Sequence, residues 1–100
     1  MEIKVKYVGI VKSILGKIKG EVVEVSENTT VQQLIDKLAV KYGEEFKHHC
    51  IEKEWGRIRN NVFIEVDGEP VLFSPAKYGM ELKGKREVVI ASIPDAFLAA

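Results

Sequence analysis

The stretch TVQQLIDKLAVKYG, residues 30–43, decides the fold. Thr30 and Gln33 make a T-x-x-Q capping box, in which the Thr hydroxyl accepts from the first turn and the Gln side chain reaches back. Gly43 follows the last periodic residue, where a left-handed cap costs a glycine little. The stretch predicts one amphipathic helix, which is too short to be stable without an apolar surface beneath it. Its apolar side chains recur at helical spacing: Val31, Leu34, Ile35, Leu38 and Tyr42.

The apolar runs outside this helix are typical of strands. Residues 3–8 and 87–92 alternate and are the densest in apolar side chains, as central strands are. Residues 17–25 predict a second strand, and residues 62–71 predict a hairpin, because Asp67-Gly68 is a turn signal. A short helical turn is expected in VKSILG, residues 11–16. These elements indicate an α+β fold with a mixed sheet of four to five strands and one main helix across one face.

The segment 44–61 has no sustained period. The sequence leaves two interpretations open: a helix extension followed by an irregular loop, or a short hairpin around Gly56. Trp55 is expected to fold over the edge of the core, with a contact to a partner as the alternative, since Trp is common in binding hot spots.

A helix on one face leaves the other face of the sheet uncovered. The strand alternation places six side chains there: Lys6, Val8, Phe63, Glu65, Val89 and Ala91. They would form a small apolar patch ringed by charge. Two interpretations carry equal weight: ordinary scatter of exposed apolar residues, or a partner-binding patch.

Composition limits the class of protein. One hundred residues make one domain, 1–100, with one modest core. The 15 basic and 15 acidic residues cancel, so the charge gives no drive toward nucleic acid or an acidic membrane. No apolar run approaches membrane-spanning length. A single cysteine cannot form an internal disulfide, which makes a reducing cytoplasm the expected location.

Residues His48, His49 and Cys50 are the only cluster with possible metal or nucleophile chemistry. Adjacent side chains diverge, and a zinc site needs spaced pairs and a fourth ligand. We therefore expect a loop with one half-buried thiol, no metal and no cofactor.

Four segments in order resemble the molybdopterin-synthase small subunit, MoaD, and related ubiquitin-like sulfur carriers such as ThiS. IKVKYVGIVKSILG (3–16) resembles the family's first strand and its glycine-ended turn. TTVQQLIDKLAVKYGEEF (29–46) is similar to its T-V-x-x-L-I-x-x-L helix. GRIRNNVFIEVDGEP (56–70) and LKGKREVVI (82–90) resemble its third-strand segment and its closing strand. The resemblance implies the β-grasp fold.

The resemblance also implies a function. Family carriers end in Gly-Gly, an ATP-dependent adenylating enzyme activates the terminal carboxylate, and sulfur transfer turns it into a thiocarboxylate. This chain would then be a protein substrate and not an enzyme. Its partners would be that activating enzyme and a molybdopterin-synthase large subunit or a similar acceptor. No nucleic acid and no membrane would be involved.

The chain departs from the family pattern at its end. It finishes SIPDAFLAA, with Ala99 and Ala100 where the two glycines would be, and it contains no Gly-Gly pair. Residues 93–100 are expected to form a flexible tail, in which Leu98 and Ala99 thread the enzyme's channel and Ala100 supplies the carboxylate. Phe97 would contact a partner, and a frayed terminus is the alternative.

Two functions follow from these observations. The first is a MoaD-like small sulfur carrier of molybdenum cofactor biosynthesis or a related sulfur-transfer pathway. In it Val8, Phe63 and Ala91 dock the open sheet face on a partner. The alternative is a β-grasp binding or assembly module that has lost the tail chemistry, which the Ala-Ala pair favours.

Overall fold

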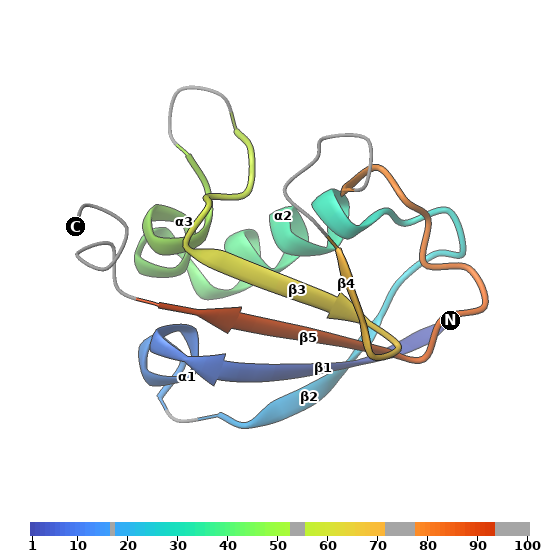
Figure 1. Cartoon of the computed structure of the whole chain (residues 1–100), viewed down its shortest axis with the longest axis horizontal. Helices are drawn as coiled ribbons and strands as arrows, with labels where there is room; N and C mark the ends of the chain where they lie inside the picture. Colours follow the sequence, from blue (N-terminus) through green and yellow to red (C-terminus); the bar gives the residue numbers. More distant parts are fainter. Residues whose placement is uncertain (17, 53–55, 72–77, 94–100) are drawn as a thin grey trace.

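The computed structural model describes residues 1–16, 18–52, 56–71 and 78–93, which build a mixed sheet with helices on one side (Figure 1). The order across the sheet is β2-β1-β5-β3-β4, which confirms the predicted α+β, β-grasp architecture. The strands are β1 (Glu2–Gly9), β2 (Gly20–Glu24), β3 (Val62–Val66), β4 (Glu69–Val71) and β5 (Glu87–Ser92). The helices are α1 (Ile10–Ile14), α2 (Val31–Tyr42) and α3 (Glu44–Cys50).

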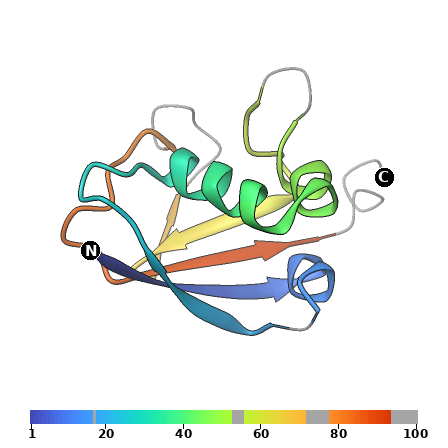
Figure 2. The same cartoon turned by 180° about the vertical axis from the view of Figure 1, so that it is seen from behind.

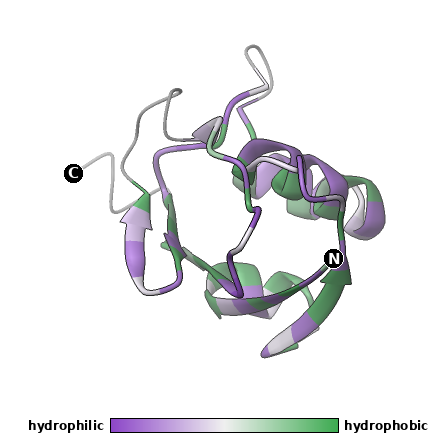
Figure 3. Cartoon of the chain, turned by 90° about the vertical axis from the view of Figure 1, so that its right-hand side faces the viewer, coloured by the Kyte–Doolittle hydropathy of each residue, from purple (hydrophilic) through white to green (hydrophobic). Residues whose placement is uncertain are grey.

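β1 and β5 are parallel neighbours in the middle of the sheet, which confirms the central position that their apolar density predicts. Their register pairs Val5 with Val88 and Tyr7 with Ile90. β3 is antiparallel to β5 and pairs Ile64 with Ile90. These side chains all point to the helix-covered face and are buried there. In the end-on view of Figure 3, the longest helical ribbon lies across one side of the sheet.

α2 lies across the sheet and begins where the capping box predicts (Figure 2). The N–H of Gln33 donates to Thr30 Oγ1 at 3.1 Å, and the N–H of Thr30 donates to Gln33 Oε1 at 3.0 Å. The apolar stripe is buried on the sheet except for Tyr42, which is partly buried, and Leu38 is 0% exposed. Val40 lies on the outer side of the same helix and is 87% exposed.

A polar cluster ties the end of α2 to the edge strand β2. The Glu21 carboxylate accepts hydrogen bonds from Tyr7 Oη at 2.7 Å, from Tyr42 Oη and from Lys41 Nζ. Burial alone would raise the pKa of Glu21, but these donors outweigh it and hold that pKa below its usual value. Because the folded-state pKa is lowered, the cluster stabilises the fold at neutral pH, and this contribution is lost as the pH falls through that pKa.

The segment after Gly43 contains a second helix on the helix side of the sheet. Gly43 has φ +89°, and it ends α2 and begins α3. α3 buries Phe46 and Cys50, so the expected loop at 48–50 is wrong. The chain then turns back, and an antiparallel bridge joins Ile51 to Ile58. Among the described residues, no helix is long and apolar enough to cross a membrane.

Replacing Leu38 with Ala should lower the free energy of unfolding by about 2–5 kcal/mol, because the side chain is buried between α2 and the sheet. The matched control is Val40→Ala on the exposed side of the same helix, which should change it by less than about 0.5 kcal/mol. Urea unfolding curves measure both variants. Equal losses for the two would contradict the packing described for α2.

Candidate functional site

The uncovered face of the sheet carries an apolar row across its middle strands. Val8 on β1 pairs with Ala91 on β5, and Ala91 pairs with Phe63 on β3. Directly paired residues point to the same face of a sheet, so these three side chains lie side by side. Val8 is 51% exposed, Phe63 is 41% exposed and Ala91 is partly exposed. We call Val8, Ala91 and Phe63 the apolar row.

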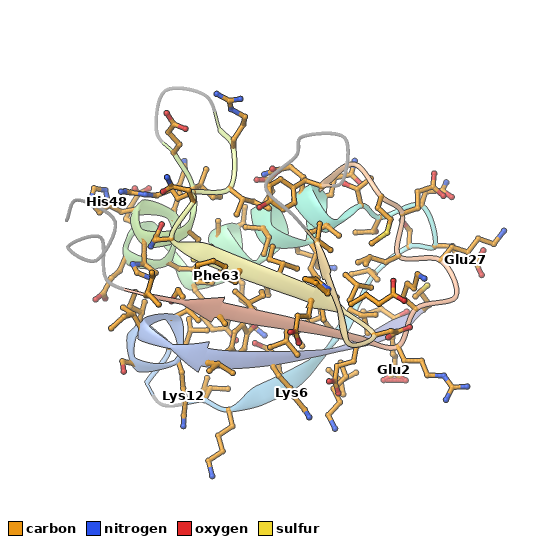
Figure 4. All side chains as sticks on the ribbon, viewed as in Figure 1. Glu2, Lys6, Lys12, Glu27, His48 and Phe63 are labelled. Carbon is orange, nitrogen blue, oxygen red and sulfur yellow. The ribbon has the colours of Figure 1, made fainter. Side chains whose placement is uncertain are left out.

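A mixed polar row lies next to the apolar row. Lys6 pairs with Val89, and Val89 pairs with Glu65. Lys6 Nζ also lies 3.5 Å from Glu87 Oε2. Figure 4 shows Lys6 beside β1 and Phe63 on β3 on this open side of the sheet. The six side chains predicted for the open face are therefore together on it, as an apolar strip bordered by both signs of charge.

The C-terminal end of β5 lies at the same edge as the apolar row. Ser92 follows Ala91 directly and pairs with Val62, and β5 ends beside α1 and α3 (Figure 1). Gly9 ends β1 opposite Ser92 with φ +81°. A Cβ on Gly9 would lie 2.2 Å from the Ser92 carbonyl oxygen, so this close approach requires glycine.

The Ser92 hydroxyl connects three elements. The backbone N–H of Val11, at the start of α1, donates to Ser92 Oγ at 2.8 Å. His49 Nε2, on α3, is hydrogen-bonded to the same Oγ at 2.9 Å. The buried end of β5 is thereby tied to both neighbouring helices.

Asn61 holds the residue after β5. It is 0% exposed, its carbonyl oxygen accepts from the Ile93 N–H at 3.0 Å, and its Nδ2 donates to the Ile93 carbonyl oxygen at 3.3 Å. Nδ2 also donates to the His49 carbonyl oxygen at 3.3 Å. Sequence reasoning missed Asn61 and Ser92, and no sequence signal indicates that these two polar side chains are buried. His49 is identified in the sequence as a candidate ligand and not as part of this contact.

The cysteine is not available as a nucleophile. Cys50 is 0% exposed, and burial raises the pKa of its thiol to about 12, while the charge of Arg59 acts in the opposite direction. His48 is exposed on α3, and His49 contacts Ser92. In the described ranges, no group of three or more His, Cys, Asp or Glu side chains could hold a metal ion.

The tail residues identified in the sequence, Phe97, Leu98, Ala99 and Ala100, lie outside the described residues, as does Trp55. Of the expected tail, the structure describes Ile93 alone. The structure therefore brings together the apolar row and the end of β5. An exposed apolar surface thus lies beside the point where the last strand ends.

Comparison with known proteins agrees with the fold. A model of the ThiS family matches residues 5–91. A search of curated proteins finds no match. The small archaeal modifier protein SAMP1 from Haloferax volcanii superposes with a TM-score of 0.73 at 14% identity, over 94% of this chain and 97% of that one.

Two further solved structures are similar. CysO, an antigen from Mycobacterium tuberculosis, has a TM-score of 0.63 at 23% identity, covering 92% of this chain and 99% of that one. A putative molybdopterin converting factor, subunit 1, from Pyrococcus furiosus has a TM-score of 0.64 at 26% identity, covering 94% of this chain and 97% of that one.

Proposed function

Because this chain belongs to the ThiS family, we propose that it is a small sulfur carrier of molybdenum cofactor biosynthesis or a related sulfur-transfer pathway. The observation that carries the proposal is the adjacency of the apolar row and the end of β5. A partner that binds the row is held one residue pair away from the point where the last strand ends. The carrier is a protein substrate in this proposal and has no catalytic group of its own.

The apolar row docks the carrier on its activating enzyme. Val8, Ala91 and Phe63 supply apolar surface, and Lys6 and Glu65 beside them favour a partner with complementary charges. A large exposed aromatic side chain in such a strip is a typical anchor at an interface. We propose that the same surface binds the acceptor after activation, so that the two partners take turns.

The tail delivers the reacting group. In the proposal, Phe97 contacts the partner, Leu98 and Ala99 thread the channel, and Ala100 supplies the carboxylate. A carboxylate oxygen attacks the α-phosphorus of ATP, pyrophosphate leaves, and an acyl-adenylate forms. A sulfur nucleophile then displaces AMP and leaves a thiocarboxylate on the carrier.

The relatives support two choices of acceptor. The Pyrococcus furiosus relative is named a putative molybdopterin converting factor, which favours a molybdopterin-synthase large subunit as the acceptor. SAMP1 is named a modifier protein, which favours another protein as the acceptor in a related pathway. Both acceptors need the same activated carboxylate.

One sequence observation favours a second function. Ala99 and Ala100 stand where family carriers have Gly-Gly, and the chain has no Gly-Gly pair. A channel that fits only the backbone of a glycine tail leaves no room for the Ala methyl groups next to the reacting carbonyl. The alternative is therefore a β-grasp binding or assembly module that has lost the tail chemistry and keeps the apolar row as its interface.

The substitution Phe63→Asp should abolish association with the activating enzyme and leave the chain folded, because Phe63 is 41% exposed on the open face. Val40→Asp is the control, since Val40 is exposed on the opposite, helical side. Melting curves establish folding, and a pull-down on the activating enzyme measures association. Val40→Asp should keep its binding to the activating enzyme. If Phe63→Asp also keeps binding, or if both variants lose binding equally, the apolar row is not the interface.

The tail itself is tested with an activating enzyme whose usual ThiS-family carrier ends in Gly-Gly. The native chain should be adenylated poorly, because displacing the reacting carboxylate by about 1 Å can cost on the order of a hundredfold in rate. The double variant Ala99→Gly, Ala100→Gly should be adenylated faster. ATP–pyrophosphate exchange at equal carrier concentration measures both. Equal rates would show that this tail works without glycine.

A further inference from the structure

Four residues that are far apart in the chain build the exit from β5: Gly9 on β1, His49 on α3, Asn61 just before β3, and Ser92 on β5. We propose that Asn61 is a positioning residue, which keeps Ile93 on the sheet and so fixes the point from which the C-terminal tail starts. The inference rests on the proposed carrier function and adds to it a residue outside the tail and the apolar row.

Asn61 continues the β3–β5 ladder by one residue. The regular pairing ends with Val62 opposite Ser92. Beyond it, the Ile93 N–H donates to the Asn61 carbonyl oxygen at 3.0 Å, as in a ladder. The return bond, to the Ile93 carbonyl oxygen, comes from the Asn61 side chain at 3.3 Å. Main chain and side chain of one residue thus hold both polar groups of Ile93.

The amide chemistry of this side chain accounts for its place in the core. Nδ2 carries two N–H groups, and it donates to the carbonyl oxygens of Ile93 and His49. Leu or Asp at position 61 could not donate to either oxygen. Asn61 Oδ1 is buried and accepts no hydrogen bond from the described residues, which lowers stability. A residue that only filled the core would be apolar here, so the two donated bonds explain the amide.

His49 ties α3 to the exit through both its main chain and its side chain. Its carbonyl oxygen accepts from Asn61 Nδ2, and its Nε2 is hydrogen-bonded to Ser92 Oγ. Gly9 allows the end of β1 to approach the Ser92 carbonyl, and Val11 donates to the Ser92 hydroxyl. The position of Ile93 is therefore set against β1, β3, α1 and α3 together.

This anchor matters for delivery because it fixes the point on the folded body from which the chain continues toward the activating enzyme. With the body docked through the apolar row, residues 94–100 must reach the active site from Ile93. If Ile93 comes off the sheet, this residue must be ordered again at each turnover. Ordering one residue costs about one to two kilocalories per mole, which corresponds to roughly tenfold in rate.

The test compares Asn61→Leu with Val66→Ala. Asn61→Leu keeps a similar side-chain size and removes both donated bonds. Val66→Ala is a core change on β3, paired with Val88 and away from the exit, and it controls for general loss of stability. Both are made in the native chain and in the Ala99→Gly, Ala100→Gly background, so that a poorly accepted native tail does not hide the effect.

Two measurements are made below the melting temperature of every variant. Amide hydrogen exchange compares Ile93 with Ile90, and it needs no partner protein. Adenylation kinetics with a ThiS-family activating enzyme give kcat and KM for the carrier. Asn61→Leu should lower the protection of Ile93 while Ile90 stays protected, and kcat should fall about tenfold with KM unchanged, because the docking surface is intact. Val66→Ala should leave Ile93 protection and kcat at the parent values.

Each of the other outcomes would overturn a specific part of the proposal for Asn61. Unchanged Ile93 protection in Asn61→Leu shows that Asn61 does not anchor the exit. Lost protection with parent kcat shows that the anchor does not position the tail. Equal effects of Asn61→Leu and Val66→Ala show a general stability role. If neither parent chain is adenylated, the carrier function fails, and the positioning role fails with it, whatever the exchange data show.

Discussion

The parallel pairing of β1 with β5 is the constraint on which the rest of the structure depends. Parallel neighbours cannot be joined by a tight turn, so the chain between β1 and β5 must cross over one face of the sheet. α2 belongs to this connecting chain and covers that face. Ile3, Val5 and Tyr7 on β1 and Val88 and Ile90 on β5 are buried beneath that helix. The same pairing leaves the alternate residues on the open face and sends the last strand toward the edge where β1 ends in α1.

Local signals predicted most of this fold. The capping box of α2 involves residues three apart, so its two hydrogen bonds could be predicted from the sequence. The Asp67-Gly68 turn adopts the positive φ values, +50° and +84°, that such a pair favours in a hairpin. α3 agrees with the helix extension, one of the interpretations left open for residues 44–61. The sequence did not favour it, because its seven residues bury only Phe46 and Cys50 and give no sustained period.

One part of the candidate site could be predicted from local sequence patterns, and the other part could not. The apolar row follows from strand alternation plus the order of strands, so Val8, Phe63 and Ala91 could be placed together from the sequence. The exit of β5 could not be placed from the sequence. The roles of Asn61 and Ser92 depend on partners that lie from 12 residues (Asn61–His49) to 81 residues (Val11–Ser92) away in the chain. Buried polar side chains are defined by tertiary contacts, and a polar residue in a sequence predicts exposure by default.

The intact mass of the native chain after incubation with ATP, sulfide and the activating enzyme of its own cell tests the carrier function most directly. Sulfide displaces AMP from the acyl-adenylate, so the account predicts a gain equal to the exchange of one oxygen atom for one sulfur atom, located on the C-terminal peptide. Omitting ATP should abolish the gain. An unchanged mass for both the native chain and its Ala99→Gly, Ala100→Gly variant would contradict the carrier function.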